Sequence, residues 1–99
     1  MQSYYEERFE RIMACTEAEW RMWLPRAIGA HAYEVSAGVA DVRIGAGRLQ
    51  LQWEVLPERA IALIRLPQLR MRFEFHELPE PERHAFMKRF DLYTQRGGG

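Results

Sequence analysis

The amino-acid sequence predicts an α+β domain, a two-layer sandwich in which an antiparallel sheet of three to four strands has an N-terminal and a C-terminal helix packed on one face. Three observations lead to this prediction. Apolar and polar residues alternate in two stretches near the middle of the chain, amphipathic segments with helical spacing lie at both ends, and prolines fall at the expected helix boundaries.

The two alternating stretches are residues 49–55 and 69–75. Successive side chains of a strand point to opposite faces of a sheet, so each stretch has one apolar face and one polar face. We expect the even-numbered side chains to face water, as in an antiparallel sheet that is covered on one side only. We expect the odd-numbered side chains to be buried, and these are Leu49, Leu51, Trp53, Val55, Leu69, Met71, Phe73 and Phe75.

Residues 3–24 predict an amphipathic helix, because their apolar residues recur at steps of one, three or four. Ser3 and Glu6 have the spacing of a capping box, in which each side chain bonds the backbone N–H of the other residue. Thr16 and Glu19 repeat this spacing, so two short helices with a break near Thr16 are the alternative. Pro25 disfavours helical geometry at the preceding residue and predicts an end or a kink there.

Residues 25–32 are typical of a connection, and residues 33–44 are ambiguous. Their apolar residues change phase across Gly38, which predicts either a bulge within one strand or a strand in the second half alone. Residues 45–47, Gly-Ala-Gly, have the length of a hairpin loop before a strand at residues 48–56.

A turn is predicted at residues 56–59, and residues 60–66 predict a central strand because apolar residues occupy both phases. Residues 66–69, Leu-Pro-Gln-Leu, allow two interpretations. They form either a tight turn with Pro67 at its second position or a bend in one long strand that is at an edge of the sheet or bulged there. We favour the turn.

The last helix is predicted to begin at residues 78–82, where Pro79 and Pro81 fit a first turn and two glutamates suit the positive end of the helix dipole. Residues 94–99 form a polar tail that we expect to be flexible. The 99 residues suffice for one hydrophobic core, so residues 1–99 are expected to form a single domain.

The composition indicates an ordinary soluble protein. Fourteen basic and fourteen acidic residues give a formal net charge of zero, so a general attraction to nucleic acid or anionic lipid is not expected. No apolar run approaches the ~20 residues of a membrane span, and the N-terminus does not read as a signal peptide. The single cysteine, Cys15, excludes an internal disulfide and fits a cytoplasmic location.

Two segments carry a family resemblance. Residues 85–99 read Ala-Phe-Met-Lys-Arg-Phe-Asp-Leu-Tyr-Thr-Gln-Arg-Gly-Gly-Gly, and residues 61–67 read Ile-Ala-Leu-Ile-Arg-Leu-Pro. Over roughly the C-terminal half, the chain resembles a family of small uncharacterised proteobacterial proteins that end in Phe-Asp-Leu-Tyr-x-Gln-Arg-Gly-Gly-Gly. The resemblance implies a bacterial protein with a native glycine tail, and it implies no activity because the family has none assigned.

Residues with catalytic or metal-binding chemistry do not form a recognisable pattern. No spacing links Cys15 to His31, His76 or His84, and a free cysteine near an apolar stripe is typical of a packed core residue. His76 and His84 are eight residues apart and lack the close ligand pairs of zinc sites. We therefore predict no catalytic residue, no metal site and no cofactor.

The polar face of the sheet is the strongest candidate for a binding site. Between residues 43 and 72 there are six arginines and two glutamates. Open sheets with arginines and amides occur in RNA-binding modules, although those sheets also expose aromatic residues, which here share the buried phase. The alternative is a solvated face with Arg–Glu pairs between strands. The predicted binding residues are Arg43, Arg48, Gln50, Gln52, Arg70, Arg72 and His76.

The sequence therefore favours a small non-enzymatic bacterial protein that binds a macromolecular partner through the polar sheet face or a strand edge. The expected partner is another protein or a second copy of the chain, and no membrane partner is expected. One alternative is a carrier-type or small-enzyme role that uses Cys15 or the C-terminal Gly-Gly-Gly, since sulfur carriers of the ubiquitin-like kind need a slim, mobile terminus. A weak RNA binder is the other alternative.

Overall fold

The computed structural model describes residues 4–94, and the statements below refer to this part of the chain. The class is α+β, as predicted. Five strands and two helices follow one another in the order β1 (Arg8–Met13), α1 (Glu17–Ile28), β2 (Tyr33–Ser36), β3 (Val39–Ile44), β4 (Gly47–Ile61), β5 (Ile64–His76) and α2 (Glu80–Thr94).

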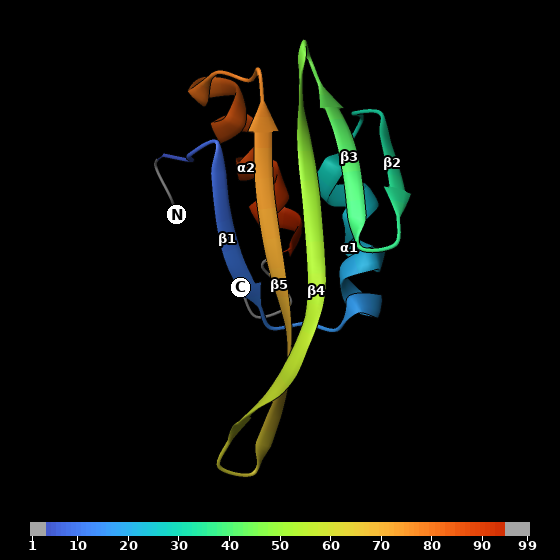
Figure 1. Ribbon diagram of the computed structural model, residues 1–99, viewed down its shortest axis with the longest axis vertical. Helices are drawn as coiled ribbons and strands as arrows, with labels where there is room; N and C mark the ends of the chain where they lie inside the picture. The colour runs from blue at the N-terminus through green and yellow to red at the C-terminus, as the bar shows by residue number, and fades with distance from the viewer. Residues whose placement is uncertain (1–3, 95–99) are drawn as a thin grey trace.

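All five strands belong to one antiparallel sheet with the order β1-β5-β4-β3-β2 (Figure 1). Strands β2 to β5 follow one another as hairpins, whereas β1 pairs with β5 from the far end of the sequence. The expectation of three to four strands was too low, because residues 8–13 and 33–36 also pair.

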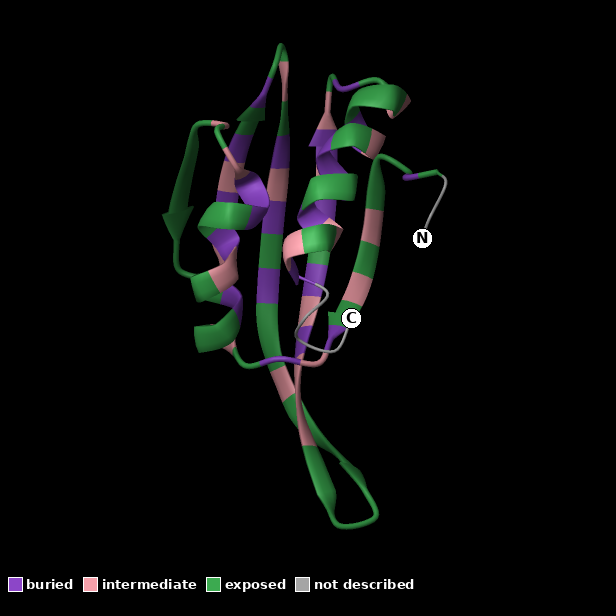
Figure 2. Cartoon of the chain, turned by 180° about the vertical axis from the view of Figure 1, so that it is seen from behind, coloured by how far each residue is buried: buried purple, intermediate pink, exposed green. Residues whose placement is uncertain are grey.

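Both helices lie on the same side of the sheet, behind it in Figure 1 and in front of it in Figure 2. The core lies between these two layers. The prediction that the odd-numbered side chains of residues 49–53 and 69–75 are buried is confirmed. Val55 is the exception, with 66% of its surface exposed, because β4 and β5 extend past the helices from this level on.

The predicted helix over residues 3–24 is wrong in its first half, because residues 8–13 form β1. Strand β1 pairs Phe9 with Phe73, and the two rings stack with centroids 4.5 Å apart. Arg11 is on the helix side of the strand, so a charged residue occupies an inward position and disguises the alternation. Ser3, half of the first expected capping box, lies outside the described residues.

Helix α1 begins at the second predicted capping box. The Thr16 side chain accepts a hydrogen bond from the Glu19 backbone N–H at 3.1 Å, and the Glu19 carboxylate accepts one from the Thr16 N–H at 2.9 Å. Pro25 lies inside the helix, so of the two predicted outcomes, an end or a kink, the end is wrong. The helix continues because Ala27 and Ile28 are fully buried, and Gly29 then ends it with φ at 75°.

Residues 33–44 form the hairpin β2–β3, which neither sequence interpretation anticipated. Ser36 pairs with Val39, so a two-residue turn that includes Gly38 connects the strands. Gly38 has φ at 73°, in the left-handed region that favours glycine. The phase change of the apolar residues across Gly38 therefore marks a turn and not a bulge.

The hairpin β4–β5 extends well beyond the rest of the sheet and makes the molecule 47 Å long but only 29 Å wide (Figure 1). The predicted turn at residues 56–59 is instead an irregularity of the β-bulge type within β4. Residues 60–66, predicted as a central strand, form the end of this hairpin, where Ile61 pairs with Ile64. We refer to residues 55–68 as the arm.

Pro67 lies within β5, so the favoured turn at residues 66–69 is wrong and the alternative, a single long strand, is correct. Pairing of β1 with β5 ends at Leu69, so Pro67 has no strand on that side. On its other side, Pro67 faces the irregular part of β4 between Leu56 and Arg59. A missing N–H at this position therefore interrupts no regular pairing.

Helix α2 begins at Glu80, within the segment where the prolines predicted a start. Its residues Phe86, Met87 and Phe90 are buried against the sheet. The predicted flexible tail starts at Thr94, the last residue of α2, and its remaining residues 95–99 lie outside the described part of the chain.

Candidate functional site

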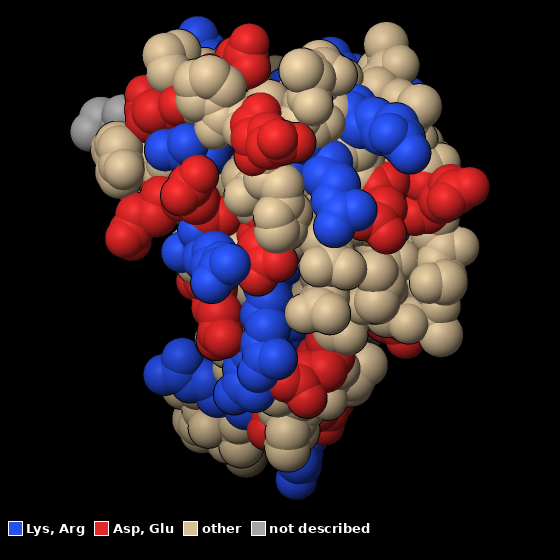
Figure 3. Space-filling model, turned by 45° about the horizontal axis from the view of Figure 1, so that its top comes forward, with Lys and Arg blue, Asp and Glu red and all other residues tan. Residues whose placement is uncertain are grey.

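The seven predicted binding residues all lie on the face of the sheet that points away from the helices, which we call the open face. They come from β3, β4 and β5, and none of them is buried. Strand β1 adds Arg8, Glu10 and Ile12 to this face, because Arg8 pairs with Glu74 and Glu10 with Arg72. Figure 3 shows acidic and basic side chains interspersed on this side of the molecule.

Ion pairs between strands occupy the centre of the open face. Arg70 Nη1 lies 2.8 Å from Glu54 Oε1, and Arg72 Nε lies 3.1 Å from Glu10 Oε2. Glu10 also lies 3.9 Å from Arg70, so it connects both arginines to β1. Exposed pairs of this kind contribute ~0–1 kcal/mol each. Two predicted binding arginines therefore have acidic partners within the chain.

Glu74 organises the neighbouring part of the open face. Its carboxylate lies 3.3 Å from Arg8 Nε and 2.8 Å from His76 Nε2. A protonated His76 would complete a second ion pair with the same carboxylate. His76, another predicted binding residue, therefore bonds a side chain of its own strand, β5.

Arg43 and Arg48 differ from the other arginines, because they pair directly with each other across β3 and β4. Neither side chain has an ion pair within residues 4–94. They border a hollow of about 460 Å³ together with Glu34 and Asp41. One carboxylate oxygen of Asp41, Oδ1, is buried without a hydrogen-bond partner among the described residues. Positive and negative groups alternate here, so the hollow has no single preferred ligand charge.

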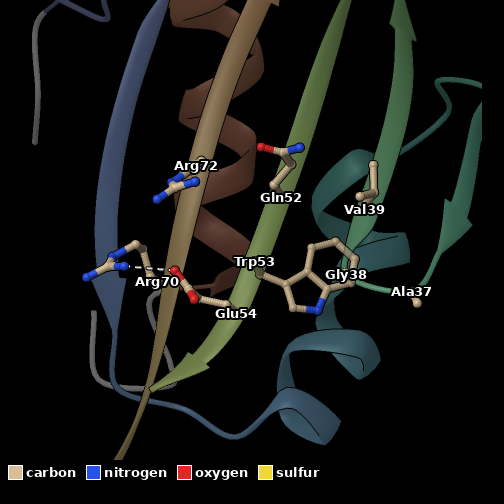
Figure 4. A pocket seen from close by; sticks show the side chains of 8 residues that line it. All are labelled: Ala37, Gly38, Val39, Gln52, Trp53, Glu54, Arg70 and Arg72. Carbon is tan, nitrogen blue, oxygen red and sulfur yellow. Dashed lines mark hydrogen bonds and ion pairs between the residues drawn. The ribbon is translucent and has the colours of Figure 1, made fainter. Parts of the chain in front are cut away.

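Gln52 lines a second, smaller hollow of about 290 Å³, which Figure 4 shows from close by. Arg70 and Arg72 line it as well, and Arg70 is joined to Glu54. Gln50 lies one row further along β4, opposite Asp41 and Glu74. The amides therefore lie among charged neighbours, in an arrangement suited to hydrogen bonds with a polar surface.

Aromatic side chains do not join the open face of β4 and β5. Trp53, Phe73 and Phe75 are buried on the helix side, where the Trp53 indole N–H donates to Glu17 at 2.8 Å. Sheets that bind single-stranded RNA stack bases on exposed rings, and these two strands offer none.

The arm carries a row of largely apolar residues beyond the end of the open face. Pairing places Leu56 opposite Gln68, Arg59 opposite Leu66, and Ile61 opposite Ile64. The β5 residues of these pairs have the same parity as Arg70 and Arg72, but β4 and β5 cross over at the base of the arm, so this row of six side chains turns away from the direction of the open face (Figure 1). We call this set the aliphatic arm face. It consists of Leu56, Arg59, Ile61, Ile64, Leu66 and Gln68.

The aliphatic side chains at the end of the arm are exposed, with Ile61 at 45%, Ile64 at 59% and Leu63 at 101%. No helix covers this part of the hairpin (Figure 2). Sequence reasoning missed the arm because apolar residues in both phases were interpreted as a doubly covered strand. The only signal was the lack of a partner element long enough to cover them.

Cys15 lacks the properties of a nucleophile. It is 1% exposed, and burial, followed by the Glu19 carboxylate, raises the pKa of its thiol to about 11. His31 packs against Phe86, and His84 against Tyr5. Among residues 4–94, no group of three or more His, Cys, Asp or Glu side chains could hold a metal ion.

The terminal glycines named as a carrier site, Gly97–Gly99, lie outside the described residues. Within residues 4–94, no helix is both long and apolar enough to cross a membrane. Comparison of the chain with protein-family models, with curated proteins and with solved structures gives no match.

Proposed function

We propose that this chain is a non-enzymatic binding protein whose partner is another protein, engaged through the open face and the aliphatic arm face. The observation that carries the proposal is the arm itself. Exposed aliphatic side chains lie at its end, and a mixed-charge surface adjoins its base. Protein interfaces commonly combine an apolar centre with a polar rim.

The exposure of the arm supports a binding role on energetic grounds. A two-stranded hairpin is only marginally stable in water without a surface to pack on. Contiguous exposed apolar residues in a soluble protein commonly mark interaction sites. A partner that covers Ile61, Leu63 and Ile64 would remove their apolar surface from water and would give the hairpin a surface to pack on.

The chemistry of the remaining residues favours binding over catalysis. The raised pKa of Cys15 keeps the thiol protonated near neutral pH, so it is a poor nucleophile. His31 contacts Phe86, His76 bonds Glu74, and His84 contacts Tyr5. The bacterial origin implied by the C-terminal resemblance and a cytoplasmic location remain part of this proposal.

The arm can be tested by substitution. Ile61→Ser combined with Ile64→Ser removes apolar surface without affecting the core, because both side chains are exposed. In cross-linking of the full chain in its native cells, we expect the wild type to form a discrete adduct that the double variant loses. Leu92→Ser is the matched control, since Leu92 is an aliphatic residue of α2 with 65% exposure. Equal adducts from all three chains would contradict the proposal.

Weak RNA binding is separated from protein binding by its salt dependence. Affinity that comes from phosphate contacts falls steeply as salt concentration rises. In a gel-shift assay with single-stranded RNA, we expect no retention at physiological salt, because acidic side chains already lie beside Arg70 and Arg72. Retention that disappears with added salt would favour the RNA alternative.

A further inference from the structure

We propose that the hollow on β2, β3 and β4, at one corner of the open face, binds a small zwitterion. Its ammonium group would lie beside Glu34 and Asp41, and its carboxylate beside Arg43 and Arg48. The hollow measures about 460 Å³ and is lined by all four of these residues. Small-molecule sites have volumes of about 300–1,000 Å³. The inference goes beyond the proposed function and does not depend on it, because the arm lies at the opposite end of β4 (Figure 1).

Strand pairing at this corner joins like charges. Glu34 of β2 pairs directly with Asp41 of β3, and Arg43 of β3 pairs directly with Arg48 of β4. Side chains that are directly opposite in antiparallel strands lie close together on one face, and like charges in such a pair are destabilising. The corner therefore consists of an acidic row and a basic row, each with repulsion between its two members.

The rest of the open face has the opposite arrangement. Acidic residues and arginines on β1, β4 and β5 pair with each other across the strands, and each of these pairs is also an ion pair. These pairs are Arg8–Glu74, Glu10–Arg72 and Glu54–Arg70. Within residues 4–94, the four charged side chains of the corner have neither an ion pair nor a side-chain hydrogen bond. The corner is thus the part of the open face where charges of both signs lie together unneutralised.

Asp41 carries the strongest sign of an unmet interaction in the acidic row. Its carboxylate oxygen Oδ1 is buried and has no hydrogen-bond partner among the described residues. A buried polar atom without a partner is destabilising, and more so when its group is charged. An ammonium group in the hollow would bring a positive charge next to this carboxylate.

The spacing of the two rows sets the size of the ligand. Asp41 and Arg43 are two residues apart on β3, so the rows lie about 7 Å apart along the strands. A ligand with one charge would relieve the repulsion in one row and would be repelled by the other row. A zwitterion satisfies both rows when several bonds separate its charges. In 4-aminobutanoate, three methylene groups separate the ammonium group from the carboxylate, which suits this spacing.

Titration of the full chain with 4-aminobutanoate at low salt, followed by two-dimensional NMR of the backbone amides, tests the site. We expect saturable shifts at residues 32–34, 41–43 and 48. Butanoate and butylamine are matched probes, because each keeps the carbon chain and lacks one of the two charges. Each should bind at least ~10-fold more weakly, since it leaves one row without a partner of opposite charge.

Substitutions assign the binding to the two rows. Arg43→Gln combined with Arg48→Gln removes the basic row, and we expect it to weaken binding of 4-aminobutanoate by at least ~10-fold. Glu34→Gln removes half of the acidic row and should weaken binding by a smaller factor. All three residues are exposed, so these variants should fold. Lys88→Gln and Glu82→Gln are matched controls on exposed positions of α2, and both should bind as the wild type does.

Three results would overturn the inference. The first is butanoate binding as tightly as 4-aminobutanoate, which would show an anion site only. The second is a set of shifts that do not saturate or that spread over the whole surface. The third is unchanged binding by the Arg43→Gln, Arg48→Gln chain when its spectrum is as well dispersed as that of the wild type. None of these results affects the cross-linking test of the arm, which depends on Ile61 and Ile64, so the two proposals can fail separately.

Discussion

The guanidinium of Arg11 in β1 meets the carboxylate of Asp91 in α2, although 80 residues separate them in the chain, with Nη2 lying 3.2 Å from Oδ2. The Tyr5 hydroxyl donates to the same oxygen at 2.8 Å. Burial, followed by this hydrogen bond, raises the pKa of Tyr5. Strand β1 pairs only with β5, so Asp91 gives the start of the chain a second attachment, to α2.

Replacement of this carboxylate should destabilise the fold. Asp91→Ala removes the shared acceptor of two partly buried donors, and hydrogen bonds to charged groups contribute ~1.5–3 kcal/mol each. We expect the free energy of unfolding, measured by urea denaturation, to fall by about 2 kcal/mol. Arg8→Gln is the matched control, because the Arg8 side chain is 76% exposed and its pair with Glu74 should contribute little. Equal losses in both variants would show that Asp91 has no special role.

The capping box of α1 provides a second stability test. The Thr16 hydroxyl accepts the Glu19 backbone N–H at 3.1 Å, so Thr16→Ala leaves that N–H without its side-chain partner. We expect a loss of ~1 kcal/mol in the free energy of unfolding for Thr16→Ala. Thr16→Ser retains the hydroxyl and should remain close to the wild type. Helix content by circular dichroism should be unchanged at low temperature, and a loss in the serine variant as large as in the alanine variant would contradict this role.

The buried and exposed faces of β4 and β5 could be predicted from the sequence, because period-2 alternation directly encodes the face of each side chain. The same signal failed at β1, where Arg11 occupies an inward position and bonds Asp91, far along the chain. It also failed at Ile61 and Ile64, because an apolar residue indicates a tendency to be covered and not which element covers it.

The candidate site was predictable in position but not in electrostatic detail. Parity alone placed Gln52, Arg70 and Arg72 on one surface. Which arginines have acidic partners depends on β1, since Glu10 reaches Arg72 over a separation of 62 residues. No local pattern contains that pairing, and the segment that supplies Glu10 was assigned to a helix.

Two glycines of the β3–β4 connection should respond differently to substitution. A Cβ on Gly47 would lie 2.4 Å from the carbonyl oxygens of both His76 and Glu77, which are fixed backbone atoms. Gly45 has open space around its Cβ position but φ at +57°. We expect Gly47→Ala to lower the free energy of unfolding by ~2–3 kcal/mol through overpacking, and Gly45→Ala by ~1 kcal/mol through backbone strain. Thermal unfolding of both variants measures which one loses more stability. A larger loss for Gly45→Ala than for Gly47→Ala would contradict the close approach at Gly47.

The buried thiol of Cys15 should make stability depend on pH in the alkaline range. Its pKa in the folded chain is raised to about 11 from a reference value of 9.0. Between these values, the unfolded chain releases a proton that the folded chain retains. Unfolding is therefore favoured as pH rises, with a limiting slope of ~1.4 kcal/mol per pH unit, and the full stability is present below pH 9.

Cys15→Ala should remove this part of the pH dependence. We expect the wild type to lose more stability than the variant between pH 9 and 10.5 in urea denaturation, whereas the difference between the two chains should be constant from pH 6 to 8. The raised pKa of Tyr5 adds a loss of the same sign at high pH, but both chains contain Tyr5, so the comparison isolates Cys15. Parallel stability curves across the alkaline range, together with rapid thiol labelling of the folded wild type at pH 7, would show that Cys15 is accessible.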